Sequence, residues 1–221
     1  MSLSTISFML ISVFLIFLGL RLFRNYRQSN DLSKLYMSVF MTFWGLTSFI
    51  VLFTIRFHWF SFYYENMGVM LFANQLSTVT LLVSNIALIL FLKNMVGMDN
   101  NWFRMLFSLL IIGFIIDLFA PLTFGEEAGF ATEISIPAEY GIPIFVIFFL
   151  LYFVMALLFF LFGRKLEGRK KIRSYLFGLC FLCMSISIPL ETSELFHPLV
   201  IFYRILYYVS VALIILVFFF V

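Results

Sequence analysis

The sequence predicts an all-α, polytopic membrane protein: a bundle of seven transmembrane helices with the N-terminus outside and the C-terminus in the cytoplasm. Hydrophobic residues make up 64% of the 221 residues and charged residues only 11%, whereas a soluble domain averages about 25% charged residues. The apolar residues also gather in runs long enough to cross a bilayer, which takes about 20 residues per helix. A water-exposed surface cannot be built from this composition, so the expected solvent is the lipid of the cell membrane.

Seven apolar runs fill nearly the whole chain, so residues 1–221 are expected to form a single transmembrane domain. Backbone groups in lipid must form their hydrogen bonds within the segment, and each run is therefore predicted to be a helix. The helices are expected at residues 3–20, 35–54, 67–92, 103–122, 142–163, 174–190 and 198–221. The one long connection is the acidic outer loop 123–141, where alternation over residues 131–136 predicts a short β-turn or hairpin.

The charges in the connections predict the orientation. The first, third and fifth connections together hold 12 of the 14 Lys and Arg residues but only 3 of the 11 Asp and Glu residues. Basic connections stay on the cytoplasmic side of a membrane. Every odd-numbered connection is therefore expected inside, and a chain of seven helices must then begin outside and end in the cytoplasm.

Missing motifs narrow the function. The last run, 198–221, has no lysine for a retinal Schiff base, and neither a phosphate-binding loop nor a nucleophile motif occurs. His58 and His197 are expected at the outer boundary, and the Cys180 and Cys183 pair sits within an apolar run where packing is the favoured role. We therefore expect no cofactor and no metal site, and we lean against an enzyme. No nucleic-acid partner is expected, because the basic residues lie in short connections between apolar runs, where they determine the orientation of the helices in the membrane.

Polar residues form stripes on several predicted helices, at about 100° per residue. Polar residues facing lipid are costly, so such stripes mark the sides that helices turn toward one another. Close helix packing and a water-lined cavity both remain open as explanations. The stripes consist of Asn74, Ser77, Thr78, Ser84 and Asn85; of Ser38, Thr42 and Gly45; and of Cys180, Cys183, Ser187 and Glu191.

A set of ionisable residues in the outer half gives the strongest site candidate. Asp117 and Arg204 lie within apolar runs, both in the outer third of the hydrocarbon at a rise of about 1.5 Å per residue, and Glu191 and Arg56 end two of the runs. An isolated charge at that depth is costly, so Arg204 is expected to pair with Glu191 or Asp117. The pair either fixes helix register or belongs to a ligand site in which Arg204 binds an anion. The full set of candidates is Arg204, Asp117, Glu191, Tyr207, Tyr208, Asn74, Thr78 and Arg56.

The layout resembles the N-terminal seven-helix sensor region of prokaryotic histidine kinases and related signalling proteins. The similar features are the predicted topology, the short basic inner connections, the 43–46 cluster Phe-Trp-Gly-Leu, the acidic outer loop and the start of the sixth helix at Arg173. The resemblance implies a sensor, but it carries no functional residue over to this chain. The dimerisation and kinase domains of that family are not among these 221 residues.

The leading hypothesis is therefore a sensor or receptor-like module that binds a small anionic ligand or a lipid in its outer half. It would signal through its basic cytoplasmic connections to a separate membrane or cytoplasmic partner. The alternative is a non-catalytic subunit of a larger membrane complex or transporter, and a lipid-acting membrane enzyme ranks last.

Overall fold

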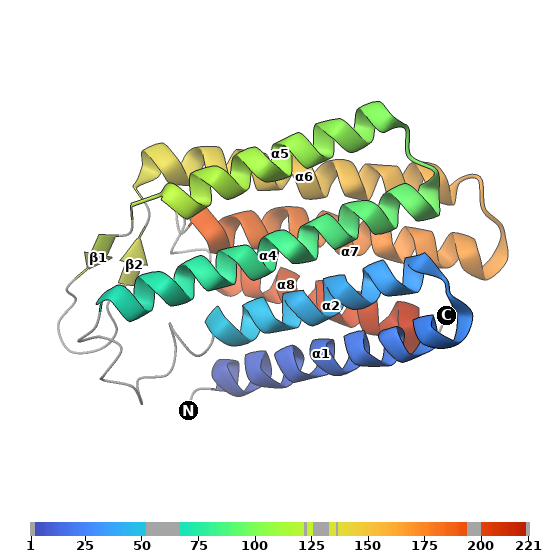
Figure 1. Ribbon diagram of the computed structural model, residues 1–221, viewed down its shortest axis with the longest axis horizontal. Coiled ribbons are helices and arrows are strands. Elements are labelled where there is room, and N and C mark those ends of the chain that lie inside the picture. Colours follow the sequence, from blue (N-terminus) through green and yellow to red (C-terminus); the bar gives the residue numbers. More distant parts are fainter. Residues whose placement is uncertain are drawn as a thin grey trace. The chain divides into compact units, whose positions relative to one another are not determined.

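The computed structural model describes residues 3–51, 67–121, 123–125, 133–135, 137–193 and 200–219. Arg56 lies outside these ranges, and the side chain of Glu191 is also outside the described ones. The described residues form seven helices and two short strands (Figure 1). The helices are α1 (Leu3–Ser29), α2 (Leu32–Val51), α4 (Met67–Val96), α5 (Asn100–Phe119), α6 (Ala138–Gly163), α7 (Gly168–Ser193) and α8 (Val200–Phe219).

The helical class and the membrane character of the chain are confirmed. Five stretches in the described part are long and apolar enough to span a membrane, and residues 204–218 of α8 form a shorter apolar helix. The five are Met9–Ser29, Phe72–Met95, Asn100–Phe119, Ala138–Gly163 and Gly168–Leu190. The chain is therefore a multi-pass, membrane-associated protein.

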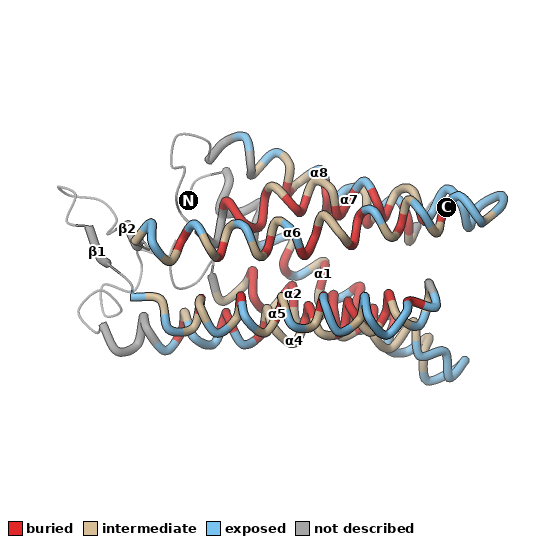
Figure 2. Tube along the Cα trace, turned by 90° about the horizontal axis from the view of Figure 1, so that it is seen from above, coloured by how far each residue is buried: buried red, intermediate tan, exposed pale blue. Residues whose placement is uncertain are grey.

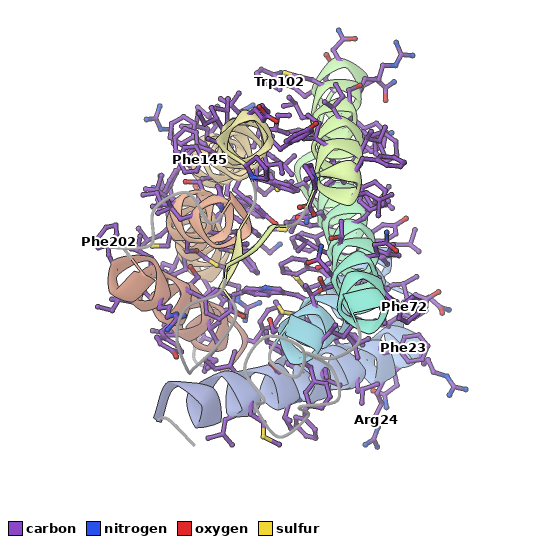
Figure 3. The ribbon with its side chains drawn as sticks, turned by 90° about the vertical axis from the view of Figure 1, so that its left-hand side faces the viewer. Phe23, Arg24, Phe72, Trp102, Phe145 and Phe202 are labelled. Carbon is purple, nitrogen blue, oxygen red and sulfur yellow. The ribbon has the colours of Figure 1, made fainter. Side chains whose placement is uncertain are left out.

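The first connection differs from the expectation. Arg21, Arg24 and Arg27 were expected in a loop after residue 20, but α1 continues through them to Ser29. The predicted end was placed where hydropathy falls, at the first arginine. The helix itself continues for as long as its backbone hydrogen bonds can form, which is through Ser29. Long basic side chains at a helix end can reach toward water while their stems stay in an apolar setting, and the side chain of Arg24 extends away from the ribbon (Figure 3).

A two-residue turn separates α1 from α2. Asn30 has a positive φ of 51°, a left-handed conformation that Asn tolerates and that commonly ends helices. Asp31 then caps the next helix, because its Oδ1 accepts a hydrogen bond of 3.0 Å from the backbone N–H of Ser33. The position of the turn is therefore set by Asn30 and Asp31 and not by the fall in hydropathy after residue 20.

The chain divides into two compact units, Met1–Phe107 and Ser108–Val221. In the first unit, α2 packs against both α1 and α4. In the second unit, α7 packs against both α6 and α8. Each unit therefore has one helix in contact with two neighbours, and α5 begins in the first unit and ends in the second.

An antiparallel strand pair lies in the long connection after α5, where a β-turn or hairpin was predicted over residues 131–136. Strand β1 (Thr123–Gly125) pairs antiparallel with β2 (Glu133–Ser135), with Phe124 opposite Ile134. The alternating segment identified in the sequence supplies β2. Its partner β1 was not predicted, because the pattern within one segment does not show which other segment pairs with it.

Buried and exposed positions alternate along the helices of each unit (Figure 2). Many of the exposed side chains are large and apolar, among them Phe72, Trp102 and Phe202 (Figure 3). Soluble monomers rarely expose so many large apolar side chains together. They are the expected lipid-facing surface of membrane helices.

Candidate functional site

The polar stripe on α4 is largely buried within the first unit. Ser77, Thr78, Ser84 and Asn85 are buried, and Asn74 is half-buried. Ser84 donates a hydrogen bond of 3.0 Å from its hydroxyl to the Phe40 carbonyl oxygen on α2. The stripe therefore faces protein, and part of it joins α4 to α2.

A second hydroxyl contact joins the same two helices. The hydroxyl oxygens of Thr47 and Thr80 lie 2.8 Å apart, and each also lies within hydrogen-bond distance of a carbonyl oxygen of its own helix. Each hydroxyl has one proton, so one of them donates to the other hydroxyl while the second donates to its own helix. Thr80 was not part of the stripe identified in the sequence. Its role depends on the position of α2, which spacing within α4 alone does not reveal.

We expect the Thr47–Thr80 contact to stabilise the first unit modestly. In a double-mutant cycle with Thr47→Val and Thr80→Val, the coupling free energy should be about 0.6 kcal/mol, the average for side-chain hydrogen bonds between membrane helices. The measurement is unfolding of the purified protein in detergent. Ser77→Ala serves as the control partner, because the Ser77 hydroxyl bonds the Asn74 carbonyl of its own helix. A coupling as large for Thr47 with Ser77 would contradict this assignment.

The stripe on α2 faces α1. The Ser38 hydroxyl donates a hydrogen bond of 2.7 Å to the Gly19 carbonyl oxygen. A Cβ placed on Gly19 would collide with the Thr42 hydroxyl, and one placed on Gly45 would lie 2.9 Å from the Ser12 carbonyl oxygen. These residues therefore allow close approach of two helices, as small residues commonly do in membranes.

Asp117 lies on the buried side of α5. Leu106, Leu110, Gly113 and Asp117 are all buried and follow one another at spacings of four, three and four residues. A Cβ on Gly113 would meet Ile147 of α6 at 2.8 Å. Asp117, with 9% of its surface exposed, is thus on the side of α5 that faces protein rather than lipid, as expected for an intramembrane carboxyl group.

Arg204 lies one turn into α8, on the same side as two tyrosines. Arg204 and Tyr208 are half-buried and Tyr207 is buried. The rings of Tyr207 and Tyr208 meet edge to face with centroids 6.3 Å apart. The Arg204 Nε atom is buried and has no hydrogen-bond partner among the described residues. The predicted pairing with Glu191 lies outside the described side chains, and pairing with Asp117 stays a prediction.

Reciprocal contacts set the register of α7 on α8. The Cys180 thiol lies 3.4 Å from the Ser210 carbonyl oxygen, and the Ser210 hydroxyl lies 3.4 Å from the Cys180 carbonyl oxygen. The rings of Phe177 and Phe218 meet edge to face at 6.0 Å. Cys180 therefore packs against the next helix, which agrees with the packing role expected for it.

One buried hydroxyl on α7 was not among the site residues predicted from the sequence. Ser187 is 1% exposed, and its Oγ atom has no hydrogen-bond partner among the described residues. Its place in the stripe, seven residues after Cys180, gave the only signal. Ser185 on the same helix is also buried, but its hydroxyl donates a hydrogen bond of 2.7 Å to the Leu182 carbonyl oxygen.

Basic residues gather at the opposite end of the second unit from Ser187. All six Lys and Arg residues between positions 164 and 173 are exposed. The ammonium group of Lys171 lies 6.0 Å from the centre of the Tyr175 ring. In the first unit, Lys93 lies 4.1 Å from the centre of the Phe103 ring. Cations beside aromatic rings are typical of the membrane boundary, where both groups are favoured.

No group of three or more metal-binding side chains gathers among the described residues. No protein-family model, curated protein or solved structure matches this chain. The function proposed below is therefore argued from the residues of the chain itself.

Proposed function

We propose that this chain is a sensor module of the cell membrane, with seven transmembrane helices, an outer N-terminus and a cytoplasmic C-terminus. Its ligand site lies in the outer half of the second unit, around Arg204. The observation that carries the proposal is the buried Nε atom of Arg204, which has no hydrogen-bond partner among the described residues. A guanidinium group in an apolar setting is costly unless paired, so a cation left partly unsatisfied favours an anionic ligand.

The charge placement supports the orientation. Arg27 lies at the C-terminal end of α1 and Lys93 at the C-terminal end of α4. Six exposed basic residues lie between the end of α6 and the first turns of α7. In a chain that crosses the membrane at each helix, these ends share one side, and basic residues favour the cytoplasm.

The packing suggests how a ligand signal would travel. A ligand bound beside Arg204 would pull on α8, which contacts α7 through Cys180 and Ser210. A thiol is a weak donor, and the Ser210 hydroxyl bonds the Leu206 carbonyl oxygen of its own helix at 2.8 Å while lying 3.4 Å from the Cys180 carbonyl oxygen. Small shifts between the helices would therefore break few strong bonds. Helix α7 begins in the basic connection, so its displacement would move the exposed cations where a cytoplasmic partner could bind.

The burial of the stripes on α2 and α4 favours a sensor over a complex subunit. A subunit would be expected to present unpaired polar residues to its neighbour. Instead, Ser38, Thr47 and Ser84 form hydrogen bonds within the first unit. Among the described residues, the buried side-chain polar atoms without a partner are in the second unit, on α7 and α8.

The test compares the wild type with Arg204→Ala in nanodiscs made from a total membrane lipid extract or from pure phosphatidylcholine. Hydrogen–deuterium exchange is measured over residues 164–173. We expect the two lipid environments to give different exchange in the wild type and the same exchange in Arg204→Ala. Ser185→Ala should behave as the wild type does. An unaltered lipid response in Arg204→Ala would overturn the proposed function.

A further inference from the structure

We infer that Ser187 and Arg204 together form a phosphate-binding site across the contact between α7 and α8. This inference rests on the proposed function and assigns the ligand class of its site. The two residues hold the only buried side-chain nitrogen and oxygen atoms without hydrogen-bond partners in the described part of the chain. Ser187 is on α7 and Arg204 is on α8, so the two unpaired atoms do not result from the geometry of a single helical turn.

The register of the two helices brings these residues to the same level. Helix α8 returns alongside α7 in the opposite direction (Figure 1). Cys180 faces Ser210, and seven residues further along α7 corresponds to seven residues back along α8. Ser187 is therefore level with residue 203. The Phe177 and Phe218 contact gives a register that places Ser187 level with residue 208, so Arg204, Tyr207 and Tyr208 lie within this span.

The chemistry of the two groups favours an oxyanion. The Nε–H of arginine can only donate a hydrogen bond, and a serine hydroxyl can donate one as well. Two donors and a positive charge match a ligand that offers several acceptors and a negative charge. The planar guanidinium group binds phosphate oxygens in a fixed fork geometry, which makes arginine a common phosphate-binding residue.

The depth of the site suits a lipid phosphate as well as a free one. Arg204 is four residues from the start of α8 at Val200, which is about 6 Å at the rise of an α-helix. The long arginine side chain can reach from this depth toward the headgroups. A phosphate at the outer leaflet, or one entering from the outer solution, would both be within reach.

Replacement of Ser187 is expected to affect stability and phosphate binding differently. In most buried positions, removal of a serine hydroxyl loses a hydrogen bond and lowers stability. At Ser187 no hydrogen bond to a described residue would be lost in the protein without ligand. Ser187→Ala should therefore leave the empty protein at least as stable as the wild type, while it weakens phosphate binding.

The experiment uses the full chain in dodecyl maltoside with three probes: inorganic phosphate, dihexanoyl phosphatidylglycerol and dihexanoylglycerol, which has no phosphate. Affinity is measured from the shift in melting temperature and from native mass spectrometry. We expect a phosphate-bearing probe to bind the wild type, Ser187→Ala to lose about fivefold in affinity, and Ser185→Ala to bind normally. Arg204→Lys keeps the charge without Nε and should lose about tenfold.

Binding of phosphatidylglycerol alone would identify a lipid headgroup site, and binding of inorganic phosphate would identify a site for a free anion. Binding of dihexanoylglycerol with equal affinity would overturn the inference, as would unchanged phosphate affinity in Ser187→Ala and Arg204→Lys. In that case the sensor proposal still stands if Arg204→Ala removes the lipid response at residues 164–173. If Arg204→Ala keeps that response, the sensor proposal falls whatever the probes show.

Discussion

Gly19→Leu should prevent stable folding of the first unit, at a cost of about 3 kcal/mol or more. Even a Cβ atom at this position would collide with the Thr42 hydroxyl. It would also lie 2.9 Å from two backbone atoms, the Ser38 carbonyl oxygen and the Thr42 nitrogen. Backbone atoms cannot turn aside as a side chain can, so α1 and α2 would have to separate. Separation would also break the Ser38 hydrogen bond to the Gly19 carbonyl.

The measurement is denaturant unfolding of the purified protein in mild detergent. Leu20→Ala is the matched control, because the neighbouring Leu20 is 58% exposed and should change stability little. Gly19→Ala should also lower the free energy of unfolding, and Thr42→Ala added to it should restore only part of that stability, because the two close backbone contacts remain. Wild-type stability in Gly19→Leu would show that α1 and α2 are not closely packed at this point.

Phe159→Ala should destabilise the second unit by about 3 kcal/mol, the cost of a large cavity in a packed core. Phe159 is 0% exposed, and its ring stacks on those of Phe177 and Phe181 with centroids 5.2 and 5.3 Å away. Because Phe159 is enclosed by protein, a lipid chain cannot enter and fill the cavity that the substitution leaves between α6 and α7. The loss therefore comes from packing contacts rather than from transfer out of water.

Phe119→Ala provides the control for Phe159→Ala. Phe119 is the same residue type and is 74% exposed, so its removal should cost less than about 0.5 kcal/mol, as for an ordinary surface substitution. Both variants are compared by thermal unfolding in the same detergent. Similar losses in the two variants would indicate that the aromatic cluster of α6 and α7 does not stabilise the fold.

Much of the helical architecture could be predicted from hydropathy alone. The run expected at residues 67–92 begins where α4 begins, and the run at 142–163 ends where α6 ends. A β-turn or hairpin was also predicted over residues 131–136, and β2 forms there at Glu133–Ser135. These features depend on local pattern, because an apolar run in lipid has to satisfy its backbone within itself.

The ends of the basic helices were harder to predict. Helix α1 continues nine residues past its expected end at residue 20, and α7 begins six residues before its expected start at residue 174. Hydropathy reports where lipid ends, whereas helix termination depends on turn geometry. At the end of α1 that geometry comes from Asn30 and Asp31.

The site residues show the same division. The sequence by itself identified Arg204 and Asp117 as charges in apolar surroundings, because composition along one helix is enough to show that a charge is misplaced. Only the tertiary structure decided which polar groups are satisfied. Ser84 and Ser187 look alike in the sequence, yet Ser84 bonds α2 and Ser187 is left without a described partner. The physical reason is that a hydrogen bond depends on which helix lies opposite and in what register, and neither is encoded in the spacing of one helix.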